Sequence, residues 1–132
     1  MTEDTRILID TNLLVYAFDK AEINKHEIAK NILSDGFKKE KKLAFSTQNL
    51  AEFFVVSTII INKPIDKETA KYIIKSISEF NYFKLLKITP SIILSAIDTH
   101  IEYNVHFWDA LIAETMKSYK IFTIITENEK DF

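Results

Sequence analysis

The sequence predicts an α/β domain, a three-layer α/β/α sandwich built around a central parallel sheet. Short apolar runs typical of buried strands alternate along the chain with longer stretches that carry apolar residues at helical spacing. Strands separated by helices favour a parallel sheet covered on both faces. The chain has 132 residues, of which 47% are hydrophobic, enough to fill one core. With one glycine and two prolines it has little room for linkers, so residues 1–132 are predicted to form a single domain.

The predicted strands are short runs rich in β-branched, leucine and phenylalanine residues. They cover residues 6–10, 43–46, 83–88 and 121–126. In a parallel sheet the carboxyl ends of the strands share one edge, where functional sites of α/β proteins lie. Asp10 ends the first predicted strand and is therefore expected at that edge, as is the tail after Thr126.

Helices are expected between these strands. One begins near Asn12, and a second begins at Asn24, with Glu27 placed to complete a capping box. Gly36 is expected to end the second helix in a left-handed cap. The buried face of this helix is predicted to comprise Ile28, Ile32 and Leu33.

The stretch "NLAEFFVVSTIII" (residues 49–61) fits two structures. Its β-branched residues favour a strand, whereas its length and the preceding Ser46 and Thr47, both potential caps, favour a buried helix, which is the interpretation adopted. Further helices are expected after Asp66 as N-cap, after Thr89 as N-cap with Pro90 in the first turn, and over 107–119. The buried residues predicted for the helix after Thr89 are Ile92, Ile93, Ala96 and Ile97.

Composition excludes several classes of protein. The absence of cysteine rules out disulfides and thiolate metal sites, and the net charge of −2 argues against binding nucleic acid through global charge. No apolar run reaches the roughly 18–20 residues that span a bilayer. The first five residues are polar, unlike a secretory leader. A cytoplasmic protein is expected.

Three carboxylates lie in apolar surroundings. Asp10 ends the first strand, Glu52 is the only charged residue in 50–61, and Asp109 follows Trp108 in an apolar helix. Each has an ordinary explanation when taken alone: Asp10 as a helix cap, Glu52 reaching solvent or a lysine, and Asp109 favouring the helix dipole. Three more acids, Glu127, Glu129 and Asp131, follow the last strand.

Taken together, these acids favour a metal site. Converging carboxylates repel one another unless one is protonated or a cation lies between them. Hard divalent cations such as Mg²⁺ or Mn²⁺ bind carboxylate oxygens. Zinc is disfavoured because the histidines, His26, His100 and His106, lack a ligand spacing.

Four segments in this order resemble the PIN-domain nucleases, and most closely the VapC-type toxin ribonucleases of toxin–antitoxin modules. They are "ILIDTNLLVYAFD", "STQNLAEFF", "FWDALIAETM" and "IITENEKDF", and the resemblance covers essentially the whole chain. It implies an α/β/α fold and a Mg²⁺- or Mn²⁺-dependent endoribonuclease that hydrolyses RNA phosphodiester bonds. It also implies a small antitoxin partner and a homodimer.

The resemblance also assigns residues. Asp10, Glu52 and Asp109 match the first three family acids, which are catalytic and bind the metal, and Thr126 matches the hydroxyl residue often found before the fourth acid. Asn128 stands where many members carry that fourth acid, so binding of a second metal ion is in question. Thr11 and Glu127 are expected beside the site.

The mechanism expected from these residues is hydrolysis by a water activated at the metal, with Asp10 and Asp109 as ligands and Glu52 completing the site or holding the water. The densest lysine cluster, comprising Lys38, Lys39, Lys41 and Lys42, is a candidate phosphate-binding set and equally a solvated turn. A dimer or antitoxin face is expected to use Ile59, Ile60, Ile61, Ile73 and Ile77, with core burial as the alternative.

Two other functions fit the sequence less well. An inactive PIN-like scaffold that binds RNA or a protein partner is favoured by Asn128, since an amide adds no charge to a metal site. A phosphatase using Asp10 as nucleophile needs a second aspartate two residues later, where this chain has Asn12.

Overall fold

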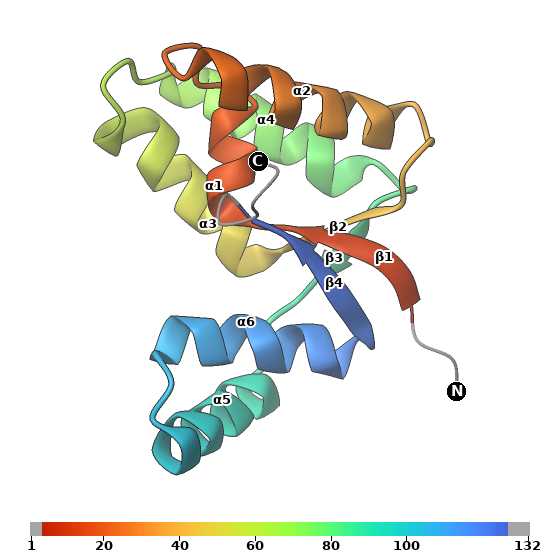
Figure 1. Ribbon diagram of the computed structural model, residues 1–132, viewed down its shortest axis with the longest axis vertical. Coiled ribbons are helices and arrows are strands. Elements are labelled where there is room, and N and C mark those ends of the chain that lie inside the picture. The colour runs from red at the N-terminus through yellow and green to blue at the C-terminus, as the bar shows by residue number, and fades with distance from the viewer. Residues whose placement is uncertain (1–3, 127–132) are drawn as a thin grey trace.

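The computed structural model describes residues 4–126 and contains a four-stranded parallel sheet between two layers of helices (Figure 1). The sheet order is β3-β2-β1-β4. Its strands are β1 (Asp4–Ile9), β2 (Leu43–Ser46), β3 (Lys84–Leu86) and β4 (Ile121–Ile125). All three neighbouring pairs are parallel. The predicted α/β sandwich is therefore confirmed.

Alternation of side chains along the strands builds a core on each face of the sheet. In the centre, Leu8 of β1 lies opposite Ala44 of β2 and Ile124 of β4. Leu8 and Ala44 belong to the core beneath α6, whereas their neighbours Ile9 and Phe45 belong to the larger core on the opposite face. A one-residue shift in register would exchange these faces, so the apolar pattern fixes the pairing.

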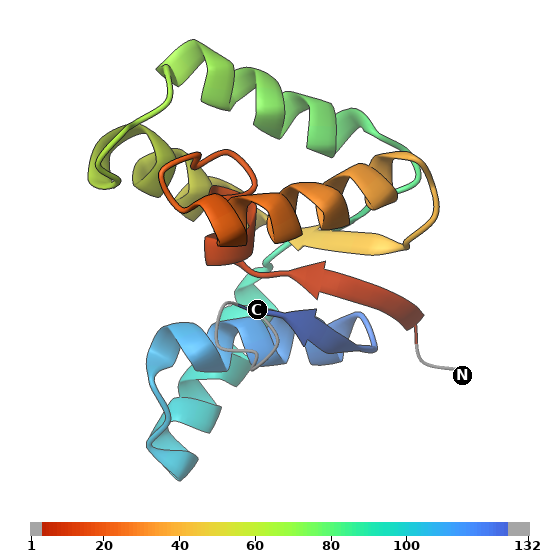
Figure 2. The ribbon, with the colours of Figure 1, turned by 45° about the horizontal axis from the view of Figure 1, so that its top comes forward.

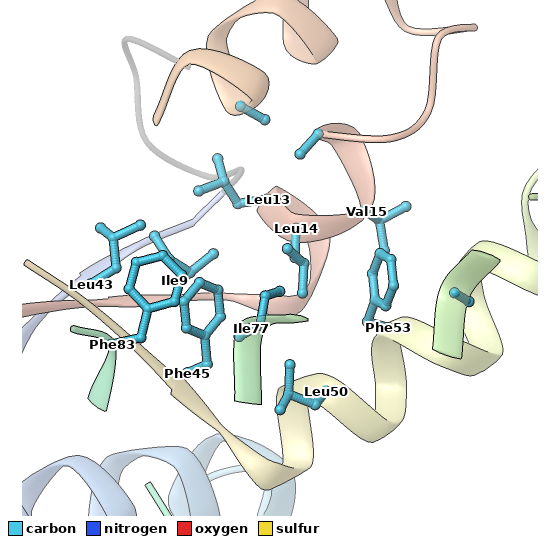
Figure 3. Packing of buried hydrophobic residues seen from close by; sticks show 13 residues of the cluster. Ile9, Leu13, Leu14, Val15, Leu43, Phe45, Leu50, Phe53, Ile77 and Phe83 are labelled. Carbon is cyan, nitrogen blue, oxygen red and sulfur yellow. The ribbon is translucent and has the colours of Figure 1, made fainter. Parts of the chain in front are cut away.

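Four helices and a π-helical turn cover the face with the larger core (Figures 1 and 2). They are α1 (Thr11–Tyr16), α2 (Ile23–Phe37), α3 (Thr47–Val55), η1 (Val56–Ile60) and α4 (Lys67–Glu79). Figure 3 shows Phe45 and Phe83 packed together beneath α1, with Phe53 of α3 beside Val15. The helix interpretation of residues 49–61 is confirmed, with its last turn π-helical.

The other face carries α5 (Pro90–Tyr103) and α6 (Phe107–Ser118). Figure 2 shows α6 against the sheet and α5 outside it. Ile92 and Ala96 of α5 are buried, but Ile93 and Ile97 are exposed, so half of the buried face predicted for this helix is wrong. The reason is that α5 packs mainly against α6 and has one narrow buried stripe.

Three predicted helix starts are confirmed in detail. The side chains of Ser46, Asp66 and Thr89 each accept a hydrogen bond from the backbone N–H three residues later, at the starts of α3, α4 and α5. These bonds satisfy backbone donors that have no partner within the helix.

The predicted ends of α2 are wrong. The helix begins after Glu22 without a side-chain cap, so Asn24 and Glu27 form no capping box. Gly36 lies inside the helix, and the left-handed residue is Lys39, with φ of 65°. Gly36 is required for another reason: a Cβ there would lie 3.1 Å from Phe83 Cε1 and closer still to Leu43.

The buried face predicted for α2 is also displaced. Ala29 is its buried apolar residue, Ile32 and Leu33 are half-buried, and Ile28 is exposed. Ala29 faces Leu13 and Leu14 of α1, and Ile28, one residue earlier on the helix, points away from this contact.

None of the helices within residues 4–126 is long and apolar enough to cross a membrane.

Candidate active site

A cleft of about 520 Å³ opens at the carboxyl edge of the sheet. It lies where β1 leads into α1 and beside α3, and the first turn of α6 closes its other side. Because α6 leads into β4, which runs parallel to β1, its N-terminus is at this edge. The lining residues are Asp10, Thr11, Asn12, Gln48, Ala51, Glu52, Val55, Val56, Trp108, Asp109 and Ile112.

Asp10 is fixed by its backbone at the junction of strand and helix. Its N–H donates to Ile125 O of β4 at 3.1 Å, and its C=O accepts from Leu14 N at 3.2 Å. Asp10 is the N-cap residue of α1, yet its side chain makes no capping hydrogen bond. The capping explanation of this carboxylate is thus wrong, and the half-buried side chain lines the cleft.

Glu52 is held by a hydrogen bond from a different helix. Thr11 Oγ1 of α1 donates to Glu52 Oε1 at 2.7 Å. Gln48 Nε2, one turn earlier on α3, makes a longer contact of 3.5 Å to Glu52 Oε2. Because both partners are uncharged, the carboxylate is oriented without its charge being neutralised.

A buried chain of hydrogen bonds positions Thr11. Ser46 Oγ donates to Asn49 Oδ1 at 2.7 Å, and Asn49 Nδ2 donates to Thr11 Oγ1 at 2.8 Å. Asn49 is 1% exposed. We refer to Ser46, Asn49, Thr11 and Glu52 as the polar relay.

The direction of the polar relay is fixed at both ends. The backbone N–H of Asn49 donates to Ser46 Oγ at 3.0 Å, so the Ser46 hydroxyl donates onward to the Asn49 side chain. At the other end an ionised Glu52 can only accept hydrogen bonds. The Thr11 hydroxyl therefore donates its hydrogen to Glu52. As a result, Ser46, which caps α3, and the Glu52 carboxylate in the cleft belong to one hydrogen-bond network.

Asp109 reaches the cleft from the opposite side of the sheet. It lies in the first turn of α6, next to Trp108, and is exposed. A negative charge in the first turn is favoured by the helix dipole, by about 0.3–1 kcal/mol in general. The position of Asp109 in the first turn of α6 therefore favours its negative charge.

The donor set of the cleft fits a hard divalent cation. Three carboxylates line it, and among the described residues no lysine, arginine or histidine does. Gln48 Oε1 is buried and has no hydrogen-bond donor within residues 4–126, so it is an additional oxygen available to a cation, a water or a ligand. These oxygens suit Mg²⁺ or Mn²⁺ better than zinc.

The carboxylates do not form a closed metal cage. Within residues 4–126, no group of three Asp, Glu, His or Cys side chains is close enough together to enclose an ion. This does not oppose Mg²⁺, which is usually held by one or two carboxylates while waters and phosphate oxygens complete its octahedral shell.

The remaining predicted site residues divide into three groups. Thr126 is half-buried and directly follows Ile125, whose carbonyl binds the Asp10 backbone, so it lies near the start of the cleft. Glu127 and Asn128 lie outside the described residues, as do Glu129 and Asp131. The lysine cluster precedes β2 and thus lies at the amino edge, remote from the cleft lining; its members are Lys38, Lys39, Lys41 and Lys42.

Several cleft and relay residues were not selected from the sequence, namely Asn12, Gln48, Asn49 and Trp108. For three of these residues, the sequence does contain a signal, which is their spacing from the three predicted acids. Gln48 is four residues before Glu52 on the same helical face, and Asn12 and Trp108 lie close to Asp10 and Asp109 in the chain. Asn49 gave no such signal, because its partner Thr11 is distant in sequence.

The protein is an α/β/α sandwich with three carboxylates in a cleft at the carboxyl edge of its parallel sheet. A model of the PIN domain family matches residues 7–132. The match spans almost the whole chain, and the protein belongs to the PIN domain family, as its motifs predicted. A comparison with curated protein sequences found no match.

Two solved structures share the fold. VapC20 of Mycobacterium tuberculosis, a toxin that cleaves the sarcin–ricin loop, aligns over 89% of this chain and 86% of its own, with 15% identity and a TM-score of 0.67. A chain of a toxin–antitoxin complex from Klebsiella pneumoniae aligns over 96% of this chain and 89% of its own, with 24% identity and a TM-score of 0.55.

Proposed function

We propose that this protein is a Mg²⁺- or Mn²⁺-dependent endoribonuclease and the toxin of a toxin–antitoxin pair. One observation carries the proposal: Asp10, Glu52 and Asp109, from three separate segments, line a single cleft that contains no basic residue among those described. Membership of the PIN domain family and the similarity to a sarcin–ricin loop cleaving toxin support RNA as the substrate.

Asp10 and Asp109 are the proposed metal ligands, because they face the cleft from opposite layers of the fold. When bound, the ion supplies a nucleophile at neutral pH and neutralises charge on the phosphodiester as it is attacked. Both carboxylates line the cleft, and among the described residues the lining contains no lysine or arginine that would compete with a cation for them.

Glu52 is proposed to orient the attacking water and accept its proton. Its Oε1 is held by Thr11 and its Oε2 by Gln48, which keeps the carboxylate plane fixed while the water approaches. A general base must lie within hydrogen-bonding distance of the proton that it accepts, and a fixed base maintains that distance. Thr11 and Gln48 are positioning residues in this scheme.

The proposed partners are RNA, a small antitoxin and a second copy of the chain. The Klebsiella pneumoniae toxin–antitoxin complex supports the antitoxin. Of the residues predicted for a contact face, Ile77 is buried in the core, and Ile61 and Ile73 are partly buried against it. Ile59 and Ile60 are 61% and 65% exposed, and these two remain candidates for a partner contact. An RNA substrate implies that the protein acts in the cytoplasm.

The lysine cluster stays a prediction. Because Lys38 and Lys42 lie at the amino edge of the sheet, an RNA bound in the cleft would have to extend around the domain to reach them. Replacement of these lysines should therefore leave the affinity for a short oligonucleotide bound in the cleft unchanged.

The direct test is isosteric removal of the proposed ligands. Asp10→Asn and Asp109→Asn should each lower metal-dependent cleavage of a structured RNA panel by at least about 100-fold, with cooperative unfolding preserved. Asp98→Asn, an exposed acid on α5, is the matched control and should cleave normally. Wild-type cleavage by either cleft variant would refute the assignment.

A further inference from the structure

Trp108 is a large apolar side chain left in an exposed position. It is 53% exposed and lines the cleft beside Asp109. It is also the only tryptophan of the chain. An exposed indole at a cleft is typical of a surface that binds a partner, because burial of its rings on binding is favourable.

The indole is held in place by its neighbours. Its ring meets Phe107 at a centroid distance of 5.3 Å and an interplanar angle of 70°. Phe107 in turn meets the His100 ring at 6.4 Å and 87°. This row of perpendicular contacts restricts the indole before anything binds, which lowers the entropic cost of ordering it against a ligand.

The rest of the cleft suits a flat ring with polar edges. Ala51, Val55, Val56 and Ile112 supply apolar surface, and Asn12 and Gln48 supply amides. Gln48 Oε1 has no hydrogen-bond donor within the described residues, so an amino group of a ligand would satisfy it. A volume of about 520 Å³ lies within the range of small-ligand pockets.

The charges of the cleft disfavour direct contact between its side chains and a phosphate. A phosphate entering among three carboxylates meets no basic side chain of the described residues. Within the cleft, contacts to the base are therefore the further source of affinity that the lining offers, beside the proposed cation. Stacking on an aromatic ring is the strongest such contact and tolerates every base, because each has a π face.

We propose that Trp108 stacks on an unpaired base next to the phosphodiester that is cleaved. This inference rests on the proposed ribonuclease activity. In an A-form duplex the bases are stacked on one another and their faces are covered, so Trp108 can engage only a base in a loop, a bulge or a free strand.

The single tryptophan makes the contact directly measurable. A Glu52→Gln variant, which keeps Asp10 and Asp109, is titrated in Mg²⁺ with oligoadenylate of about ten nucleotides, a length typical of single-strand sites. Stacking should quench the Trp108 emission in a saturable way. The same strand paired with oligouridylate should leave the emission unchanged.

Substitution then tests the energetic role. In the same Glu52→Gln background, Trp108→Leu should weaken binding of labelled oligoadenylate by about 5- to 150-fold, and Trp108→Phe by less, because a benzene ring retains a π face. Tyr72→Leu, at an exposed aromatic residue of α4 outside the cleft, should leave binding unchanged.

The outcomes separate this inference from the proposed function. The stacking proposal is overturned if wild-type protein cleaves these strands but Trp108→Leu neither weakens binding nor slows cleavage. The exposed indole would then be a candidate for contact with a protein partner. Equal quenching by the strand and the duplex would also overturn the stacking proposal. If wild-type protein neither binds nor cleaves RNA, the ribonuclease proposal itself fails.

Discussion

The carboxylate of Glu52 depends on residues that never reach the cleft. Ser46 and Asn49 are buried. Ser46 donates a hydrogen bond to Asn49, and Asn49 donates one to the Thr11 hydroxyl. The Thr11 hydroxyl is thereby oriented to donate its own hydrogen to Glu52. Buried polar groups of this kind are costly if one bond is lost, because the partner is left unsatisfied. The polar relay thus couples stability to the geometry of the site.

Thr11→Val removes the hydroxyl while keeping the shape. Glu52 Oε1 loses its 2.7 Å donor and Asn49 Nδ2 loses its acceptor, so we expect destabilisation by about 1–3 kcal/mol. Cleavage should fall by roughly 10- to 100-fold, as is typical when the support of a metal-site residue is lost. Urea unfolding and single-turnover cleavage measure the two effects.

Two variants isolate the role of the hydroxyl. Thr11→Ser retains it and should restore most of the cleavage. Thr115→Val removes another buried hydroxyl, which donates to Leu111 O within α6. This change should cost stability, and cleavage should fall only as far as the folded fraction does. Equal loss of cleavage in Thr11→Val and Thr115→Val would contradict a positioning role.

At the scale of single residues, the sequence predicted the charged groups and missed the neutral ones. Asp10, Glu52 and Asp109 stand out because a charge in an apolar context needs a reason. Asn49 and Gln48 are unremarkable in the sequence, since their roles come from contacts with Thr11 and Glu52 that only the fold creates. Gly36 shows the same limit, because its neighbour Phe83 is remote in the chain.

Gly36→Ala tests that packing explanation. In an exposed helix interior this change stabilises by up to about 1 kcal/mol, but here the added Cβ meets Leu43 Cγ at 2.9 Å. We expect destabilisation by about 1–3 kcal/mol, the usual cost of overpacking. Asn31→Ala, an exposed position on the same helix, should stabilise slightly in the same urea experiment. A gain in stability with Gly36→Ala would show that Leu43 yields easily.

Among the elements, those with local signals were predicted best. Ser46, Asp66 and Thr89 were identified as caps from sequence and act as caps, because capping bonds join residues three apart. Burial of α5 was predicted less well, since helical periodicity gives the apolar face but not whether the sheet or another helix covers it. Ile93 and Ile97 are exposed because α5 packs mainly on α6.

Two caps provide a matched comparison at the element scale. Ser46→Ala and Thr89→Ala should each cost about 1 kcal/mol, because each removes one acceptor at a helix start. Only Ser46 also donates to Asn49, so only Ser46→Ala should slow cleavage by the folded enzyme. Cleavage is compared at a temperature where both variants remain folded. Equal cleavage rates would show that the cap and the site are independent.

On the scale of the whole molecule, the cleft is assembled from both layers of the sandwich. Asp10 and Glu52 come from the layer of α1–α4, and Asp109 comes from α6 across the sheet (Figure 2). A parallel sheet allows this because its carboxyl edge is open to both faces. The family assignment was predictable from the order of the motifs, whereas only the structure revealed that no basic residue lines the cleft within residues 4–126.

A cation bound as proposed, between ligands from the two layers, would link the stability of the fold to metal binding. Ions that bind only the folded protein stabilise it by RT ln(1 + [L]/Kd), which is about 2.7 kcal/mol at a hundred times Kd. For a domain of 132 residues this corresponds to a rise in Tm of roughly 10 °C. Scanning calorimetry in Mn²⁺, against NaCl of equal ionic strength to remove simple screening, measures it.

Asp10→Asn removes the proposed ligand on the α1 side of the sheet, so the rise in Tm with Mn²⁺ should largely disappear in this variant. Asp98→Asn lies outside the cleft and should respond as wild type does. Because this readout needs no RNA, it tests the metal site independently of the substrate. A rise of equal size in wild type and Asp10→Asn would mean that Mn²⁺ binds elsewhere, and the three carboxylates that line the cleft would then need another explanation.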